Sequence, residues 1–161
     1  MLYKKQLTKE QALQKIKQYC SYQERCHKEV KGKLYSYGLH KNEVEALIGD
    51  VIENNYLNEG RFAIQFAGGK FRIKHWGRKK IQYELQQKGI STYAIKTALK
   101  ELDEKDYTQT LHTLASAKWN NLAAEHYLTR QAKTQAYLLQ KGFEAALVSK
   151  AIQELRSKHK N

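Results

Sequence analysis

Proline is absent from the 161-residue sequence, and cysteine occurs only twice. The lack of proline removes the commonest helix breaker and suits a helical protein in which glycine ends the helices. Alternating runs of β-branched residues bounded by turn residues are also missing, whereas apolar residues recur at spacings of three and four along nearly the whole chain. The sequence therefore predicts an all-α fold.

Long hydrophobic runs are missing as well. No apolar run approaches the roughly 18 residues that a membrane span needs. The first six residues lack the apolar stretch of a secretory signal. Hydrophobic residues still make up 41% of the chain, which is enough for a folded core. We therefore expect a folded cytoplasmic protein that makes no membrane contact.

The two cysteines, Cys20 and Cys26, stand six residues apart, with His27 beside the second. A metal site would need a fourth ligand and a recognised ligand spacing, and the sequence offers neither. The cysteines are better interpreted as reduced thiols that pack as small apolar groups. The sequence predicts no metal site and no cofactor.

Catalytic motifs are missing too. The segment Gly68-Gly69-Lys70 lacks the upstream glycine, the following Ser or Thr and the preceding strand of a phosphate-binding loop. The six histidines are scattered without ligand spacing, and the acids are too dispersed to form a carboxylate cluster for a nuclease metal. We therefore expect a protein that is not an enzyme.

A repeat is marked by three glycines. Gly38, Gly89 and Gly142 each follow Tyr or Lys, precede an apolar residue and lie about fifty residues apart. When the three copies are aligned on these glycines, four flanking positions are apolar in every copy. The position before the glycine holds Leu34, Leu85 and Leu138. The three positions after it hold Val44, Ile95 and Val148; Ile48, Leu99 and Ile152; and Val51, Leu102 and Leu155. Each glycine is predicted to take a left-handed conformation that ends one helix, and the apolar set after it to line one face of the next.

A third helix is expected to precede each of these pairs. Thr8 with Gln11 resembles a capping box for a helix over residues 9–20, and Ser21 with Glu24 resembles another box that opens the next helix. In the middle of the chain residues 58–71 supply this helix, with an interruption near Gly68 and Gly69. Residues 106–121 supply it in the last part.

The predicted architecture is thus a set of three tandem three-helix repeats. Their boundaries are residues 1–57, 58–105 and 106–161. A unit of about fifty residues has little core of its own, so neighbouring units should pack end to end. We expect an elongated, curved array.

The formal charge is +13, with 29 Lys and Arg against 16 Asp and Glu, which favours a polyanionic partner such as nucleic acid or an acidic protein surface. No acid occurs between Glu59 and Glu84. This stretch, the basic window, holds Arg61, Lys70, Arg72, Lys74, Arg78, Lys79 and Lys80. The interleaved aromatics are Phe62, Phe66, Phe71, Trp76 and Tyr83.

Basic residues interleaved with aromatics are typical of surfaces that contact phosphates, although a solvated helix face is the ordinary alternative. The spacing of the aromatics favours a place in the core for Phe62, Phe66 and Trp76. The cations favour a contact, because seven positive charges without a compensating acid repel each other. The best candidate contact residues are Arg72, Lys74, Arg78, Lys79 and Lys80, followed by Arg61 and Lys70.

Two stretches of the middle repeat, YLNEGRFA (residues 56–63) and GRKKIQYELQQKGIS (residues 77–91), closely resemble the paired signatures of the RecX family, bacterial regulators of the RecA recombinase. Residues 21–38 resemble the first-repeat helix of that family. There are two departures: Arg78 stands where a Pro often follows the Gly, and Gly60 stands where a larger residue is usual.

The resemblance implies a modulator and not a catalyst. A RecX-like protein would bind the groove of the RecA–DNA filament, contact the recombinase and single- or double-stranded DNA, and limit filament extension. It would depress ATPase, strand-exchange and coprotease activity, and so take part in regulating DNA repair and the SOS response. We expect the chain to act as a monomer.

A sequence-reading DNA-binding protein is the alternative, because a helix, a glycine turn and a second helix superficially resemble a helix-turn-helix. The recognition helix would be STYAIKTALKEL, residues 91–102. It offers chiefly Lys96 and Lys100, without an Asn, Gln or Arg set for base edges.

Overall fold

The computed structural model describes residues 6–158, and helices are the only regular elements in that range. They are α1 (Lys9–Tyr22), α2 (His27–Ser36), α3 (Lys41–Glu53), α4 (Glu59–Gly69), a π-helical turn η1 (Lys70–Lys74), α5 (Arg78–Gln87), α6 (Thr92–Lys100), α7 (Glu104–Asn121), α8 (Tyr127–Gln140) and α9 (Ala145–Lys158). The predicted all-α fold is confirmed.

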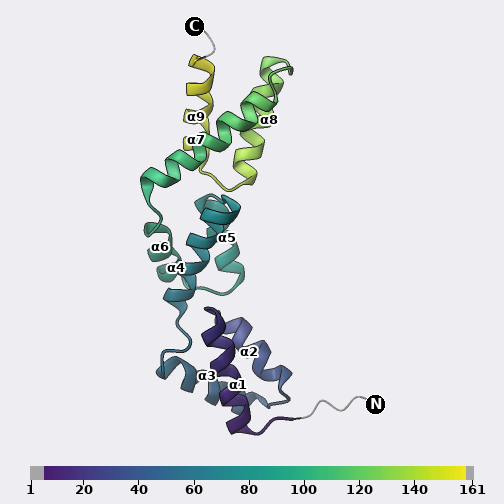
Figure 1. Ribbon diagram of the computed structural model, residues 1–161, viewed down its shortest axis with the longest axis vertical. Coiled ribbons are helices and arrows are strands. Elements are labelled where there is room, and N and C mark those ends of the chain that lie inside the picture. Colours follow the sequence, from purple (N-terminus) through teal and green to yellow (C-terminus); the bar gives the residue numbers. More distant parts are fainter. Residues whose placement is uncertain (1–5, 159–161) are drawn as a thin grey trace, which may run out of the picture.

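The helices form three successive units, α1–α3, α4–α6 and α7–α9, stacked along one long axis (Figure 1). The first and last units lie at opposite ends of an elongated molecule, as the repeat predicted. Helix α7 begins at Glu104, so the predicted boundary after residue 105 falls inside its first turn.

The three repeat glycines end α2, α5 and α8, and their φ angles of +86°, +78° and +98° confirm the predicted left-handed conformation. After Gly89 and Gly142, the next residue folds back onto the helix. The Ile90 N–H donates to the Leu85 carbonyl at 3.1 Å, and the Phe143 N–H to the Leu138 carbonyl at 3.2 Å. These bonds satisfy carbonyls that the helix end leaves free, and they bury the apolar residue that follows the turn.

The two predicted capping boxes have different outcomes. Thr8 and Gln11 cap α1 reciprocally, as predicted. The box assigned to Ser21 and Glu24 is wrong, because α1 keeps Cys20 buried and continues through Ser21 to Tyr22. The next helix instead opens at Cys26, whose N–H donates to the Glu29 carboxylate at 3.0 Å.

The predicted interruption near Gly68 and Gly69 is also displaced. Helix α4 runs unbroken to Gly69, widens into η1 and stops at His75, which has a φ of +57°. A Cβ at residue 68 would lie 2.7 Å from a guanidinium nitrogen of Arg72. Glycine at this position therefore makes room for a side chain and does not end the helix.

Two hydrophobic cores divide the described chain. Buried side chains of α1–α3, among them Ile16, Leu34 and Val51, form the first core. The second core runs without a break through α4–α9. Of the described residues in the first unit, only Cys26 contributes to it. The second and third units therefore share a core from which the first stands apart.

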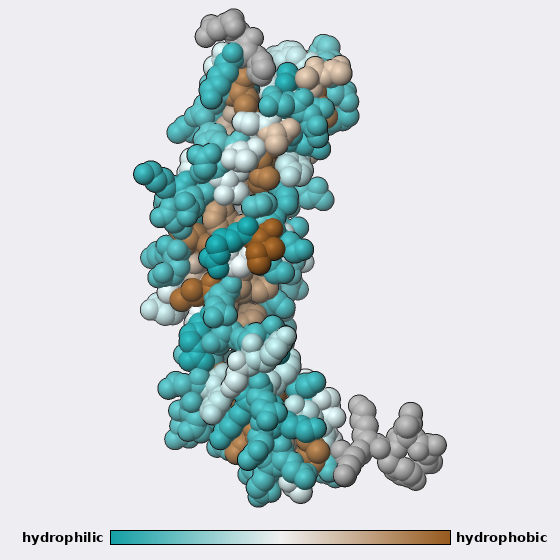
Figure 2. Space-filling view, viewed as in Figure 1, coloured by the Kyte–Doolittle hydropathy of each residue, from teal (hydrophilic) through white to brown (hydrophobic). Residues whose placement is uncertain are grey.

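On the face shown in Figure 2, hydrophilic residues cover most of the surface and hydrophobic ones form small separate patches. Among residues 6–158 no helix has the length and apolar character to cross a bilayer. The same residues contain no group of His, Cys, Asp and Glu arranged to hold a metal ion.

Candidate nucleic-acid interface

The basic window runs along one continuous part of the middle unit. Arg61 lies in the first turn of α4, and Lys79 in the first turn of α5. Between them the chain passes through η1, which carries Arg72 and Lys74. The window therefore extends across the middle unit, from its junction with the first unit to its junction with the third, and its members have different surroundings.

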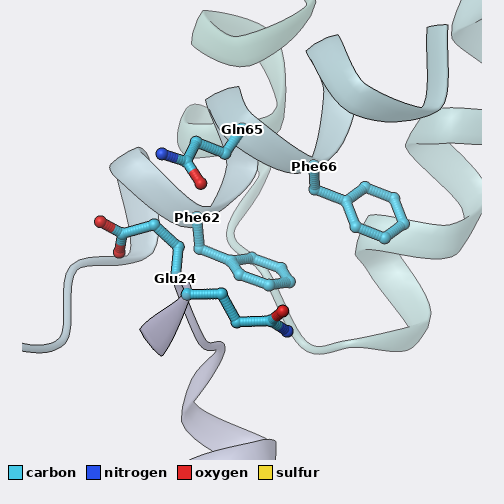
Figure 3. Close-up of a pocket in the computed structure, with 5 residues that line it drawn as sticks. Glu24, Phe62, Gln65 and Phe66 are labelled. Carbon is cyan, nitrogen blue, oxygen red and sulfur yellow. The ribbon is translucent and has the colours of Figure 1, made fainter. Parts of the chain in front are cut away.

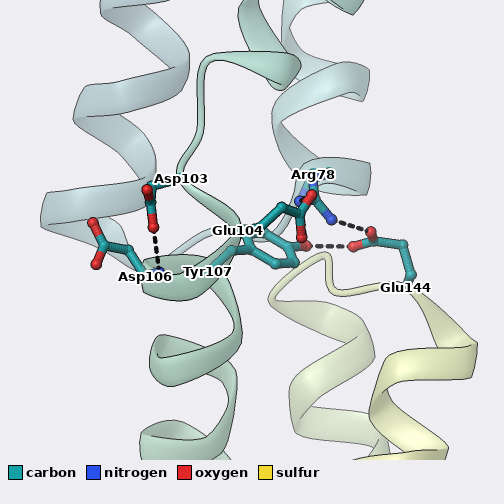
Figure 4. Close-up of polar contacts among 6 residues, drawn as sticks. All are labelled: Arg78, Asp103, Glu104, Asp106, Tyr107 and Glu144. Atoms are coloured by element: carbon teal, nitrogen blue, oxygen red, sulfur yellow. Dashed lines mark hydrogen bonds and ion pairs between the residues drawn. The ribbon is translucent and has the colours of Figure 1, made fainter.

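Arg78 is committed to contacts inside the protein. Its guanidinium pairs with Glu144 at 2.7 Å and with Glu104, and lies 3.8 Å from the centre of the Tyr107 ring (Figure 4). Only 18% of its side chain is exposed. Arg78, a predicted contact residue, thus uses its charge inside the protein, where it joins the second unit to the third.

Tyr107 completes this network. Its buried hydroxyl donates to Glu144 and accepts the Arg78 backbone N–H at 3.0 Å. Burial and the bond to Glu144 raise the pKa of Tyr107 far above its ordinary value. Burial alone would lower the pKa of Arg78, but the hydrogen bonds that its guanidinium donates to Glu104 and Glu144 outweigh it and raise the pKa. Arg78 therefore stays charged and fixed.

Arg61 is also engaged internally. Its Nε donates to Glu24 at 2.8 Å and one Nη to the Asn55 carbonyl at 2.6 Å, while 42% of its side chain remains exposed. Glu24 belongs to the connection between α1 and α2, so the pair links the first unit to the second. Arg61 is thus a weaker contact candidate than the lysines.

Arg72, Lys74 and Lys79 keep exposed side chains and make no ion pair within residues 6–158. Their backbones have structural roles: the Lys74 carbonyl accepts from Lys141 Nζ at 2.9 Å, and the Lys79 N–H donates to the Gly142 carbonyl at 2.9 Å. The side chains of Arg72, Lys74 and Lys79 take no part in these backbone bonds, so they remain available to an external anion.

Lys70 and Lys80 belong to a group of five residues, the lysine–aromatic cluster: Phe66, Lys70, Trp76, Lys80 and Lys88. Lys70 Nζ lies 5.0 Å from the centre of the Trp76 ring and Lys80 Nζ 4.7 Å from it. Lys70 and Lys88 lie 5.5 and 5.6 Å from the centre of Phe66. Three ammonium groups thus surround two rings with no acid paired to them in the described chain.

Sequence reasoning missed Lys88 because it lies beyond Glu84, outside the basic window. The end of α5 returns beside α4, which no local pattern of charge reveals.

The aromatic residues of the basic window differ in burial: Phe62 and Phe71 are buried, whereas Phe66 and Trp76 pack against the core with part of their surface exposed. Ammonium groups beside partly exposed rings can meet phosphates and stacked bases together.

Family comparisons fit this architecture. One model, RecX second three-helix domain, matches residues 58–99, and a second, RecX third three-helix domain, matches residues 104–152. The chain belongs to the RecX family. The family is one of regulatory proteins.

RecX relatives resemble the chain over most of its length. The regulatory protein RecX of Clostridium perfringens is 32% identical over 120 residues, which are 73% of this chain and 55% of that protein. RecX of Prosthecochloris aestuarii is 28% identical over 145 residues, 89% of this chain and 93% of that protein. The chain spans half the length of another relative, from Oceanobacillus iheyensis.

The crystal structure of RecX from Lactobacillus salivarius superposes with a TM-score of 0.83 at 28% identity, covering 92% of this chain and 96% of that one. A RecX fold is therefore shown for all three units and not only for the two that the family models match.

Proposed function

We propose that this RecX chain binds the filament that RecA forms on DNA and inhibits the recombinase, including its ATPase, strand-exchange and coprotease activities. Family membership supports a regulatory role. The observation that supports the filament contact is the set of cations in the middle unit that have no ion pair within residues 6–158: Lys70, Arg72, Lys74, Lys79, Lys80 and Lys88.

An elongated protein suits a helical filament, because it can follow a groove past several subunits. The unpaired cations lie about the middle of its length, on η1, on α5 and directly after α5. Each cation that neutralises a phosphate releases counterions, so this contact should weaken as salt rises. Arg61 and Arg78 would contribute indirectly by holding the units in line.

Sequence-specific DNA recognition is less well supported. As a recognition helix, α6 would bury Ala94, Ile95 and Ala98 and present Lys96 and Lys100 to the groove. Lysines at such positions hold phosphates, whereas base reading uses paired donors and acceptors from Arg, Asn or Gln. Nothing on this face of α6 provides them.

The test is the DNA-dependent ATPase of the cognate RecA, titrated with the protein. We expect the rate to fall as the protein approaches stoichiometric excess and to recover as salt is raised. A rate that stays constant at excess, in low salt, would contradict the proposed function.

A further inference from the structure

A cavity of about 190 Å³ opens where the first unit meets the second. Gln23 and Glu24, in the connection between α1 and α2, form one wall, and Phe62, Gln65 and Phe66 of α4 form the other (Figure 3). This junction pocket is therefore made by two units, and the function proposed above does not account for it.

The pocket is suited to a flat ring. An engineered cavity of about 150 Å³ holds benzene, so this one has room for a planar heterocycle. The Phe62 and Phe66 rings lie 5.8 Å apart, centre to centre, with planes inclined by 28°. In Figure 3 the Gln65 and Glu24 side chains extend on one side of Phe62, and Phe66 lies on the other. Classed by chemistry, the pocket therefore has an aromatic wall, Phe62 and Phe66, and a polar wall, Gln23, Glu24 and Gln65.

The polar wall carries unused hydrogen-bonding groups. The side-chain amides of Gln23 and Gln65 make no hydrogen bond to other residues of the described chain. One Glu24 oxygen accepts from Arg61, and the other is buried without a partner. An amide offers both donors and acceptors, which is the pattern along the edge of a nucleobase.

The surrounding charge decides the class of ligand. Phe66 lines the pocket and also carries Lys70 and Lys88 of the lysine–aromatic cluster. The one acid in the pocket is already neutralised by Arg61. A cationic side chain of a partner protein would be repelled here, whereas a neutral ring attached to a phosphate chain would be attracted.

We propose that the junction pocket binds one unpaired nucleobase of a single-stranded nucleic acid, with Lys70 and Lys88 holding the neighbouring phosphates. The base enters beside Phe62 and Phe66, and the amides of Gln23 and Gln65 bond its edge. The proposal rests on the nucleic-acid contact of the proposed function, but not on any effect upon the recombinase. A base inside a duplex is stacked and paired, so it cannot enter.

The test uses the full chain and no recombinase. Fluorescence anisotropy compares a labelled strand of about 16 nucleotides with a strand of equal length that carries abasic residues in its centre. Both strands have the same phosphates. We expect the normal strand to bind about tenfold more tightly, since only this strand can stack a base in the pocket.

Variants then locate the base. Gln65→Met removes the amide at similar size, and Phe66→Leu removes the ring. Both should bind the two strands alike, at the abasic affinity. Gln65→Met should keep the unfolding midpoint of the unaltered protein, whereas Phe66→Leu should lower it because Phe66 packs against the second core, so its binding is measured well below that midpoint. Tyr93→Leu is the matched control, because Tyr93 is 82% exposed on α6, and should still distinguish the strands.

Three outcomes would overturn the pocket assignment. Equal binding of both strands by the unaltered protein would exclude a base contact, while salt-sensitive binding would leave the proposed function intact. Discrimination that persists in both Gln65→Met and Phe66→Leu would place the base elsewhere. Failure to bind either strand at low salt would contradict both the pocket and the DNA contact of the proposed function.

Discussion

The two junctions of the molecule are made from the same repeat positions in different ways. Between the second and third units, the N–H groups of Gly77 and Lys79 donate to the carbonyls of Lys141 and Gly142 at 2.8 and 2.9 Å. The free N–H groups at the start of α5 thus meet the free carbonyls at the end of α8.

Between the first and second units, side chains make the contact. The carbonyl of Gln87, at the end of α5, accepts from Lys28 Nζ at 2.8 Å, and Arg61 pairs with Glu24. Lys28 stands ten residues before its repeat glycine, as Lys79 does. At this repeat position, Lys28 makes its junction contact through its ammonium group, whereas Lys79 makes its contact through its backbone N–H.

One residue accounts for this difference. Twelve residues before the repeat glycine stand Gly77 in the second unit and Cys26 in the first. A Cβ at residue 77 would overlap the backbone of Gly142 and Phe143, so only glycine allows the backbones to touch. Cys26 holds the chains apart, and its buried side chain packs against the second core. The second and third units form one body, to which the first is joined by side chains.

The largest expected difference between the two junctions comes from alanine at their repeat glycines, Gly142 and Gly89. Gly142→Ala should cost about 2–5 kcal/mol of unfolding free energy. The left-handed conformation accounts for about 1–2 kcal/mol of this cost. Overpacking adds about 1–3 kcal/mol, because the new Cβ would lie 2.6 Å from the backbone nitrogen of Lys80. Gly89→Ala should show only the conformational cost, since its Cβ meets the flexible end of Lys28 at 3.3 Å. Urea unfolding measures both.

Gly49→Ala provides the control for the glycine variants. Nothing lies within 4 Å of a Cβ there, in the middle of α3, so alanine should stabilise the protein by about 0.5–1 kcal/mol. Equal losses for Gly142→Ala and Gly89→Ala would mean that the two junctions are alike.

The second test compares the arginines at the two junctions. Arg78→Ala leaves Glu144, 26% exposed, without its cation and with only the Tyr107 hydroxyl as a partner, and should cost about 2 kcal/mol, below the range for a fully buried pair. Arg61 itself is more exposed, at 42% against 18% for Arg78, so Arg61→Ala should cost less, about 1 kcal/mol, although the Glu24 side chain that it leaves is only 18% exposed. Thermal or urea unfolding gives both values, and a larger loss for Arg61→Ala would reverse the comparison.

The third test uses pH. The unfolded chain releases the Tyr107 proton near pH 10, whereas the raised pKa keeps it in the folded state. The stabilisation is thus intact below about pH 10 and is lost above it, by up to about 1.4 kcal/mol per pH unit. Tyr107→Phe should flatten this alkaline loss, at a cost of about 1 kcal/mol near neutral pH for its lost hydrogen bonds.

Tyr93→Phe, at an exposed position, is the control for the pH dependence and should leave the alkaline slope as it was. Urea unfolding between pH 8 and pH 11 follows the slope. If Tyr107→Phe and the unaltered protein lose stability equally, the network does not link the units as described.

The repeat was predictable because it depends on local signals: a glycine that ends a helix and apolar residues at helical spacing. Gly38, Gly89 and Gly142 confirm it. Helix starts were less predictable. Ser21 and Glu24 match a capping pattern, but α1 keeps Cys20 buried and runs past Ser21 to Tyr22, so Ser21 lies inside a helix and cannot open one.

The candidate site was predictable only as a region. Counting charges within the window overlooked acids from other units, so Arg61 and Arg78 were counted as free although Glu24 and Glu144 pair with them. Lys88 was left out for the opposite reason: it is distant along the chain but close in space to Phe66. Pairing and proximity across units depend on tertiary packing, which a single sequence does not display.

The most direct measurement of the proposed role compares two double variants in the recombinase ATPase assay. Each removes two positive charges: Lys79→Gln with Lys80→Gln at the start of α5, or Lys96→Gln with Lys100→Gln on α6. We predict that the first loses inhibition, increasingly as salt rises, and that the second inhibits like the unaltered protein. Full inhibition by the first variant in low salt, or loss of inhibition only in the second, would contradict the filament contact proposed for the middle unit.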